Sequence, residues 1–216
     1  MIVDYDTEAW PWQRLWQEVA ETSEPVSAWH GERDQNTVFH AMFYESFGHV
    51  FSDLYRRFVA EVAGPAVMAG RPYYFQKVPT FRACLPGCRS VLEFHTDAEY
   101  GHQDAEVNCW LPFGNAWGSN SIYLGSVPQT VDYGQMLVFD GVHLFHGSRP
   151  NRTGVTRFSI DFRLIAKEDY HDTAERSVAA GVPLGLGDYF CDFGEVTPLT
   201  PDDQATSQRR PLGATR

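Results

Sequence analysis

Residues 156–163 read Thr-Arg-Phe-Ser-Ile-Asp-Phe-Arg, with polar and apolar side chains in alternation. This period of two predicts a β-strand, because successive side chains of a strand point to opposite faces of its sheet. One face is apolar and continues to Leu164, so we expect helices to cover it. Such a strand's polar face is usually solvated, but it can also line an interior in which each buried charge has a partner. Here that face carries Arg157, Ser159, Asp161 and Arg163.

Turn residues separate a series of short strand patterns along the chain. We expect strands at 73–79, 80–85, 90–95, 105–112, 121–126, 135–140, 142–146 and 155–165. About eight short strands at regular spacing favour a sandwich, jelly roll or barrel over a parallel α/β sheet.

The first 70 residues carry two helical patterns. Residues 7–21 have an apolar stripe among polar side chains, which predicts an amphipathic helix. A longer pattern with aromatic residues at spacings of three and four covers 36–63, with Gly48 as a point of interruption. Gly64-Pro65 should end this helix. We interpret both helices as a layer that backs the sheet.

The length of 216 residues fits one domain with a substantial core. We expect a single domain over residues 1–195, made of a helical layer (1–70), a β core (71–166) and an aromatic C-terminal extension (167–195). That extension should pack either on the β core or on a partner subunit, which keeps a homodimer open. Residues 196–216 contain almost no apolar side chains and should form a disordered tail.

The composition excludes several classes of protein. The formal net charge of −11 repels phosphates, which argues against a nucleic-acid or anionic-membrane partner. No apolar run is long enough to cross a membrane, and residues 1–6 lack the features of a signal peptide. The four cysteines are too few and too scattered for a disulfide framework, so we expect reduced thiols and a cytoplasmic protein.

Three residues have the types needed for a metal site. His95 and Asp97 stand two positions apart at the end of an expected strand, so both side chains can reach one ion. His146, directly before Gly147, can add a second imidazole. Two histidines and one carboxylate can bind one face of a six-coordinate ion and leave the other face free, as in non-haem Fe(II) oxygenases. His143 competes for the third position, but on a regular strand it would point to the opposite side, so we favour His146.

The polar face of the last strand offers an anion site. Arg157 follows His146 by eleven positions, and its guanidinium can bind a dicarboxylate through two parallel hydrogen bonds. Ser159, on the same face, can donate a further hydrogen bond. Asp161 and Arg163 would then form an internal ion pair or contact the substrate.

Together, His95-x-Asp97, His146-Gly147 and Arg157-x-Ser159 resemble the Fe(II)- and 2-oxoglutarate-dependent oxygenases. That resemblance implies a double-stranded β-helix, which is a cupin-like jelly-roll barrel, here mostly β and backed by the N-terminal helices. The sequences of residues 75–82, 93–97, 108–112 and 161–163 are similar to those of small bacterial members of the streptomycin-biosynthesis type. These members are distantly related to phytanoyl-CoA dioxygenases. The resemblance covers residues 73–165.

The resemblance also implies roles for individual residues. Fe(II) would be held by His95, Asp97 and His146, and the distal carboxylate of 2-oxoglutarate by Arg157 with Ser159. Weaker candidates for the near end of 2-oxoglutarate are Asn108, Tyr123 and Gln76. Candidate substrate contacts are Arg82, Tyr100, His102, Trp110, Trp117 and Arg163, although each of these also has a purely structural interpretation.

The implied activity is hydroxylation, or another oxidation, of a small polar metabolite such as an amino acid or amino sugar in antibiotic biosynthesis. O2 would be consumed, and succinate and CO2 released. Related halogenases replace the carboxylate ligand by a small residue, so Asp97 points away from halogenation. Two alternatives stay open: a cupin-type metal-dependent sugar isomerase or epimerase, which leaves Arg157-x-Ser159 unexplained, and a non-catalytic β-barrel that binds a small molecule.

Overall fold

The computed structural model describes residues 1–21, 37–88, 94–177 and 181–194. Its helices are α1 (Trp12–Val19), α2 (Val38–Ser46), α3 (Ser52–Phe58) and α4 (Gly64–Met68). The π-helical turns η2 (Phe47–Phe51) and η3 (Val59–Ala63) join α2, α3 and α4 into one run, and two 3-10 turns follow later, η4 (Asp97–Tyr100) and η5 (Gly118–Asn120). The strands are β1 (Ile2–Asp4), β2 (Tyr73–Gln76), β3 (Thr80–Cys84), β4 (Val107–Pro112), β5 (Ile122–Leu124), β6 (Val127–Pro128), β7 (Gln135–Phe139), β8 (His146–Ser148), β9 (Arg157–Ala166) and β10 (Phe190–Cys191).

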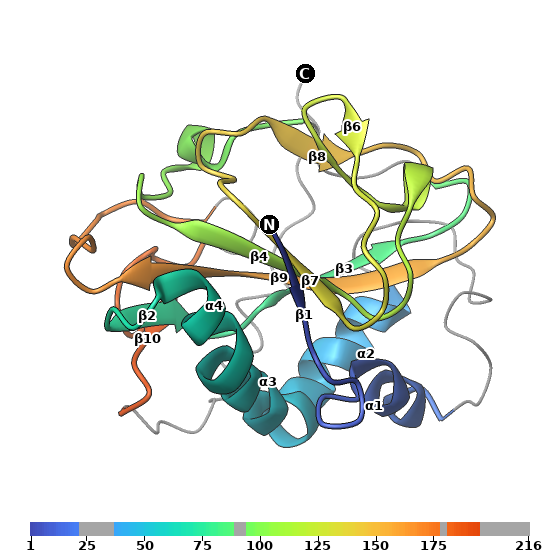
Figure 1. The fold of residues 1–216 in the computed structure, drawn as a ribbon, viewed down its shortest axis with the longest axis horizontal. Coiled ribbons are helices and arrows are strands. Elements are labelled where there is room, and N and C mark those ends of the chain that lie inside the picture. The colour runs from blue at the N-terminus through green and yellow to red at the C-terminus, as the bar shows by residue number, and fades with distance from the viewer. Residues whose placement is uncertain (22–36, 89–93, 178–180, 195–216) are drawn as a thin grey trace.

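Two antiparallel sheets organise these elements. The larger has the order β1-β7-β4-β9-β2-β10, with β3 also paired to β9, and the smaller has the order β6-β5-β8. In Figure 1 the helices lie on one side of the large sheet and the small sheet on the other. The chain is therefore mostly β with a layer of N-terminal helices, as the sequence predicted.

Strand β9 lies at the centre of the large sheet, and its two faces differ. Its apolar side chains are buried against the helices: the Phe158 ring lies 5.3 Å from Trp16, and the Phe162 ring 5.3 Å from Tyr55. This confirms the predicted helix-covered face. On the opposite face a second apolar cluster joins Trp110 of the large sheet to Ile122 of the small one.

The predicted closed barrel is not confirmed, because the two sheets stay separate over the described residues. The strand expected at 142–146 is wrong: residues 141–144 form a turn, and β8 begins at His146. Most of the strand expected at 90–95 lies outside the described residues, and so does the tail expected at 196–216.

The helical layer differs from its prediction in two places. The first residues form β1, which pairs with β7 at the edge of the sheet, and α1 starts only after Pro11. Gly64-Pro65 does not end the long helix: the run continues through α4 to Met68, and Ala69 leaves it in the left-handed conformation. The Tyr73 hydroxyl crosses the helix here and donates to Val59 O at 3.2 Å, and a Cβ on Gly64 would lie 1.8 Å from that hydroxyl oxygen.

The C-terminal segment packs back on the large sheet, one of the two placements expected from the sequence. Strand β10 pairs with β2, and the Phe193 ring stacks on Phe75 at 4.6 Å. The four cysteines are buried and are not joined in disulfides, as expected. In the part of the chain that the structure describes, no helix is both long and apolar enough to cross a membrane.

Candidate metal centre

His95 and His146 lie side by side because their backbones are paired. The His95 N–H donates to His146 O at 3.0 Å, and the His146 N–H donates to His95 O at 2.9 Å. The next residue along β8, Gly147, lies against Phe94, and a Cβ there would come within 3.0 Å of the Phe94 Cα. The glycine after the second histidine therefore allows the two histidine-bearing segments to approach.

Asp97 is placed by its own backbone and by the turn that it begins. The Asp97 N–H donates to Gly141 O at 2.8 Å. Thr96 caps the turn η4, and its N–H donates to the Glu99 carboxylate at 2.9 Å. These bonds hold the start of η4 against the turn that precedes β8.

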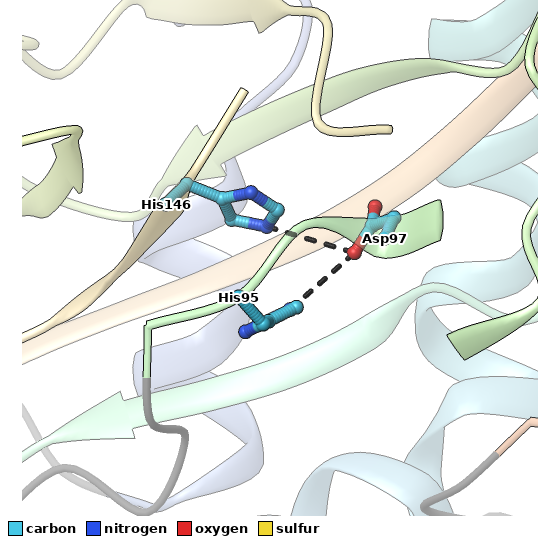
Figure 2. Close-up of side chains that lie close together, drawn as sticks. All are labelled: His95, Asp97 and His146. Atoms are coloured by element: carbon cyan, nitrogen blue, oxygen red, sulfur yellow. Dashed lines mark ion pairs between the residues drawn. The ribbon is translucent and has the colours of Figure 1, made fainter. Parts of the chain in front are cut away.

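The three side chains converge on one point (Figure 2). Asp97 Oδ1 lies 3.4 Å from His95 Nε2 and 3.6 Å from His146 Nε2, and all three residues are buried. Their ligand atoms lie within 4.8 Å of one another, and no other such group occurs among the described residues. Divalent first-row metals bind these donors at about 2.0–2.2 Å, so neighbouring donors around one ion lie roughly 3 Å apart. The spacing fits a metal ion.

The protonation states also suit a metal. Burial by itself would raise the pKa of Asp97, but the Arg163 guanidinium and the facing imidazoles outweigh it and hold this pKa well below its ordinary value. Burial lowers the pKa of His146. The neutral His146 ring donates from Nδ1 to Leu144 O at 2.8 Å, which leaves the Nε2 lone pair facing Asp97. At neutral pH the centre therefore offers a carboxylate oxygen and an unprotonated nitrogen.

The second oxygen of Asp97 is fully engaged. Asp97 Oδ2 accepts hydrogen bonds from Arg163 Nη2 at 2.6 Å, Arg163 Nε at 3.0 Å and Asn108 Nδ2 at 2.7 Å. Asn108 and Arg163 are direct partners in the register of β4 and β9. One cross-strand pair thus holds Oδ2 and leaves Oδ1 to the histidines.

Arg157 and Ser159 lie buried at the other end of the same strand face. Arg157 Nε donates to Asn120 O and Nη1 to Ser159 Oγ, both at 2.8 Å. The guanidinium also lies over the Trp110 ring, 5.3 Å from its centroid. With Arg157 4% exposed and Ser159 0% exposed, this face is a polar interior and not the solvated surface that charged alternation usually indicates.

Comparison with known proteins places this arrangement in a family. Over 159 residues the chain is 36% identical to the streptomycin biosynthesis protein StrG of Streptomyces griseus, an alignment that covers 74% of this chain and 78% of StrG. The chain belongs to the StrG family. No family model matches it.

This StrG-family protein is also similar to solved structures, of which ThoJ shares its fold. The apo form of ThoJ, a non-heme monooxygenase, has a TM-score of 0.50 at 14% identity and covers 82% of this chain and 78% of ThoJ. HygX of Streptomyces hygroscopicus with nickel and 2-oxoglutarate bound has a TM-score of 0.49 at 12% identity, over 82% of this chain and 87% of HygX.

The three weaker candidates for binding 2-oxoglutarate contact other protein groups or point away from His146. Asn108, a candidate for 2-oxoglutarate, contacts Asp97, and its Oδ1 is buried with no hydrogen-bond partner. Gln76 donates to Val78 O at 2.7 Å and accepts from the Tyr189 hydroxyl at 2.9 Å. Tyr123 pairs with Gly147, and so points to the face of the small sheet opposite to His146.

The candidate substrate residues are spread around the centre. Arg82 forms an ion pair with Asp161 at 3.0 Å, whereas Arg163 pairs with Asp97, so the alternative in which Asp161 and Arg163 pair with each other is not confirmed. The Tyr100 ring lies 4.8 Å from the His95 ring, whereas His102 binds Glu106 at 2.7 Å. Trp110 lies under Arg157, and Trp117 is 40% exposed.

Sequence reasoning missed Glu106, Tyr189 and Gly141. Glu106 is 2% exposed, binds His102 and lies 3.7 Å from Arg163 Nε. Tyr189 accepts a hydrogen bond from Arg163 Nη1 at 2.7 Å. No local pattern marks any of the three: His102 and Glu106 stand four positions apart, but residues 102–106 are not helical, so this spacing does not predict their contact.

Proposed function

We propose that this StrG-family protein is a non-haem Fe(II)- and 2-oxoglutarate-dependent oxygenase. It hydroxylates, or otherwise oxidises, a small polar metabolite such as an amino acid or amino sugar in natural-product biosynthesis, and releases succinate and CO2. The observation that carries this proposal is the buried convergence of His95, Asp97 and His146. The name of the relative StrG supports the biosynthetic setting.

In this proposal His95, Asp97 and His146 hold Fe(II) through two imidazole nitrogens and Asp97 Oδ1. Bound Fe(II), with 2-oxoglutarate and O2, supplies the oxidising power needed to break an unactivated C–H bond. Asp97 takes a coordination position that a halide would need, which favours oxidation over halogenation.

The other end of the polar face binds the cosubstrate. Arg157 is a buried guanidinium whose Nε and Nη1 are already oriented by Asn120 and Ser159. A guanidinium held in this way binds a carboxylate strongly, because little side-chain freedom remains to be lost. We assign the distal carboxylate of 2-oxoglutarate to Arg157 and Ser159.

We also infer that the two sheets correspond to the two sheets of a double-stranded β-helix, in a single domain over residues 1–195. The second apolar cluster between Trp110 and Ile122 supports this, because it packs the sheets face to face.

Anaerobic titration with Fe(II) and 2-oxoglutarate tests the activity. The wild-type protein should bind one Fe(II) and develop a weak visible metal-to-ligand absorption when 2-oxoglutarate is added, and His146→Ala should abolish it. His143→Ala is the matched control, because this exposed histidine three positions away binds Asp140 and should leave the absorption unchanged.

Other outcomes would contradict the proposal in recognisable ways. Binding of metal without any change on adding 2-oxoglutarate would favour the cupin-type isomerase or epimerase. Absence of stoichiometric metal would leave only a binding module. If the absorption develops, release of succinate across a panel of amino acids and amino sugars identifies the substrate.

A further inference from the structure

Arg163 joins the candidate metal centre to the C-terminal segment through hydrogen bonds to Asp97 and Tyr189. Its Nε and Nη2 donate to Asp97 Oδ2, and its Nη1 donates to the Tyr189 hydroxyl at 2.7 Å. A second buried carboxylate, Glu106, lies 3.7 Å from its Nε. Arg163 is 8% exposed, so its guanidinium donates these hydrogen bonds inside the protein and not at its surface.

The chain of contacts continues from Arg163 into the large sheet and the C-terminal segment. The Tyr189 hydroxyl donates to Gln76 Oε1 at 2.9 Å, and Gln76 Nε2 donates to Val78 O at 2.7 Å. The Tyr189 backbone is itself fixed, because Lys77 N donates to Tyr189 O at 2.7 Å. Tyr189 therefore links Arg163 to a rigid sheet edge.

These contacts decide which atoms Asp97 offers. A free carboxylate can bind a metal through one oxygen or through both. Asp97 Oδ2 accepts three hydrogen bonds, so only Oδ1 faces the imidazoles. An Asp97 held in this way uses one coordination position, which leaves three of six for a chelating cosubstrate and oxygen.

We propose that Arg163 is a positioning residue of the metal centre, and that the C-terminal segment takes part in the centre because Tyr189 holds the Arg163 guanidinium on Asp97 Oδ2. This inference rests on the proposed metal-dependent function. It assigns Arg163 to the ligand Asp97, in place of the substrate contact expected from the sequence. Outer-shell partners of this kind typically change metal affinity by 10–100-fold when they are removed.

Co(II) is a suitable probe, because its visible absorption reports the ligand set without turnover. Binding of Co(II) to the full chain is titrated under anaerobic conditions for wild type, Arg163→Gln, Arg163→Lys and Tyr189→Phe. Arg163→Gln should weaken Co(II) binding by about 10–100-fold and shift the absorption bands. Arg163→Lys should recover part of the affinity, since an ammonium keeps the charge but cannot bind Asp97 and Tyr189 with the same fork.

Tyr189→Phe keeps the test valid if the Arg163 variants fold poorly. It removes one hydroxyl, and it should weaken Co(II) binding several-fold and shift the bands in the direction seen for Arg163→Gln. Tyr170→Phe is its matched control, because that hydroxyl lies in the same C-terminal segment but bonds Leu186 N and Asp172. Arg56→Gln is the control for the arginine, since Arg56 bonds Phe193 O on the helical side of the sheet.

The two proposals fail in different ways. If wild type binds no Co(II), the metal centre itself is wrong and the inference falls with it. If wild type binds one Co(II) but Arg163→Gln and Tyr189→Phe bind it equally or more tightly with unchanged spectra, only the positioning role is overturned. Equal losses in Tyr189→Phe and Tyr170→Phe would also overturn it, because they would indicate general loosening of the segment.

Discussion

Gly141 helps to position Asp97 through its own carbonyl group and through the space that it leaves for Asn108. Its replacement by alanine should therefore lower the stability of the protein by a measurable amount. The Gly141 carbonyl accepts the Asp97 N–H at 2.8 Å. The Asn108 amide, which donates to Asp97 Oδ2, lies where a Cβ on Gly141 would point. A methyl group at position 141 would enter the space that this amide occupies.

The size of the effect follows from the distances. A Cβ on Gly141 would lie 2.5 Å from Asn108 Nδ2 and 2.6 Å from its Cγ. Since non-bonded heavy atoms prefer about 3.5–4.0 Å, the amide has to move by roughly 1 Å, which breaks its bond to Asp97. Overpacking costs about 1–3 kcal/mol and a lost hydrogen bond to a charged group about 1.5–3 kcal/mol, so we expect Gly141→Ala to lower the unfolding free energy by about 2.5–6 kcal/mol.

A double-mutant cycle tests whether Asn108 is the cause. Asn108→Ala alone loses the bond to Asp97, but it also removes the amide that the new methyl group would meet. Gly141→Ala should therefore add little in the Asn108→Ala background, and the double variant should be more stable than the sum of the single effects predicts by nearly the whole effect of Gly141→Ala alone. Urea unfolding followed by tryptophan fluorescence measures all four proteins, because the chain has 6 tryptophans.

Gly185→Ala is the control for this cycle, since a Cβ there meets only the Tyr170 hydroxyl, at an ordinary 3.9 Å. Its unfolding free energy should stay within about 0.5 kcal/mol of wild type. Additive effects of Gly141→Ala and Asn108→Ala would refute the steric argument. So would a Gly141→Ala protein as stable as the Gly185→Ala control.

Three further predictions concern other parts of the molecule. Arg157→Gln should raise the 2-oxoglutarate requirement tens to hundreds of times, for a loss of about 2–4 kcal/mol, while metal content by elemental analysis stays nearly unchanged. Gly147→Ala should weaken Co(II) binding in titrations, because its Cβ would press on the Phe94 Cα at 3.0 Å and separate the two histidine segments. Burial and repulsion from Arg82 lower the pKa of His40 to about 4. The unfolded chain takes up a proton on His40 near its ordinary pKa of about 6.5, so the unfolding free energy should fall as the pH drops from 6.5 to 4. In His40→Gln this fall, measured by urea unfolding, should be smaller by about 1–3 kcal/mol.

The apolar face of β9 could be predicted from the sequence because the information is local. Alternation over residues 157–164 assigns each side chain to a face, and the burial of Phe158 and Phe162 under aromatic helix residues agrees with that assignment. The helices that cover this face are likewise marked by aromatic residues at helical spacing. The end of the long helix was missed because the chain leaves it at Ala69, in the left-handed conformation that glycine usually adopts at the end of a helix.

The preference for His146 over His143 agrees with the geometry of the centre, but the reason given for it is wrong. We favoured His146 over His143 because a strand over 142–146 would send them to opposite sides. That segment is a turn, in which His143 is exposed and binds Asp140. His146 lies beside Asp97 because it begins β8 and pairs with His95, a contact across 51 residues that no local period contains.

The sequence predicted which side chains share the polar face of β9, but it did not predict which groups bind them. Arg157 bonds a carbonyl 37 positions away, and Arg163 a carboxylate 66 positions away. The sequence offered Asp161 as the nearest partner for Arg163, two positions along the same strand. Cross-strand pairing instead puts Arg82 of β3 opposite Ser159, within diagonal reach of Asp161, so this carboxylate is neutralised from the neighbouring strand.

The register of β4 against β9 therefore decides the state of Asp97. Because Asn108 lies directly opposite Arg163, one cross-strand pair supplies every side-chain donor to Asp97 Oδ2 found among the described residues. A slip of one residue would bring Val107 or Cys109 opposite Arg163 and turn the Asn108 amide to the other face of the sheet. Asp97 would then be a buried carboxylate without the amide donor to its Oδ2. The proposed metal ligand is thus held by the same strand pairing that orders the apolar core, so a change in the packing along β9 is also expected to change the contacts of Asp97.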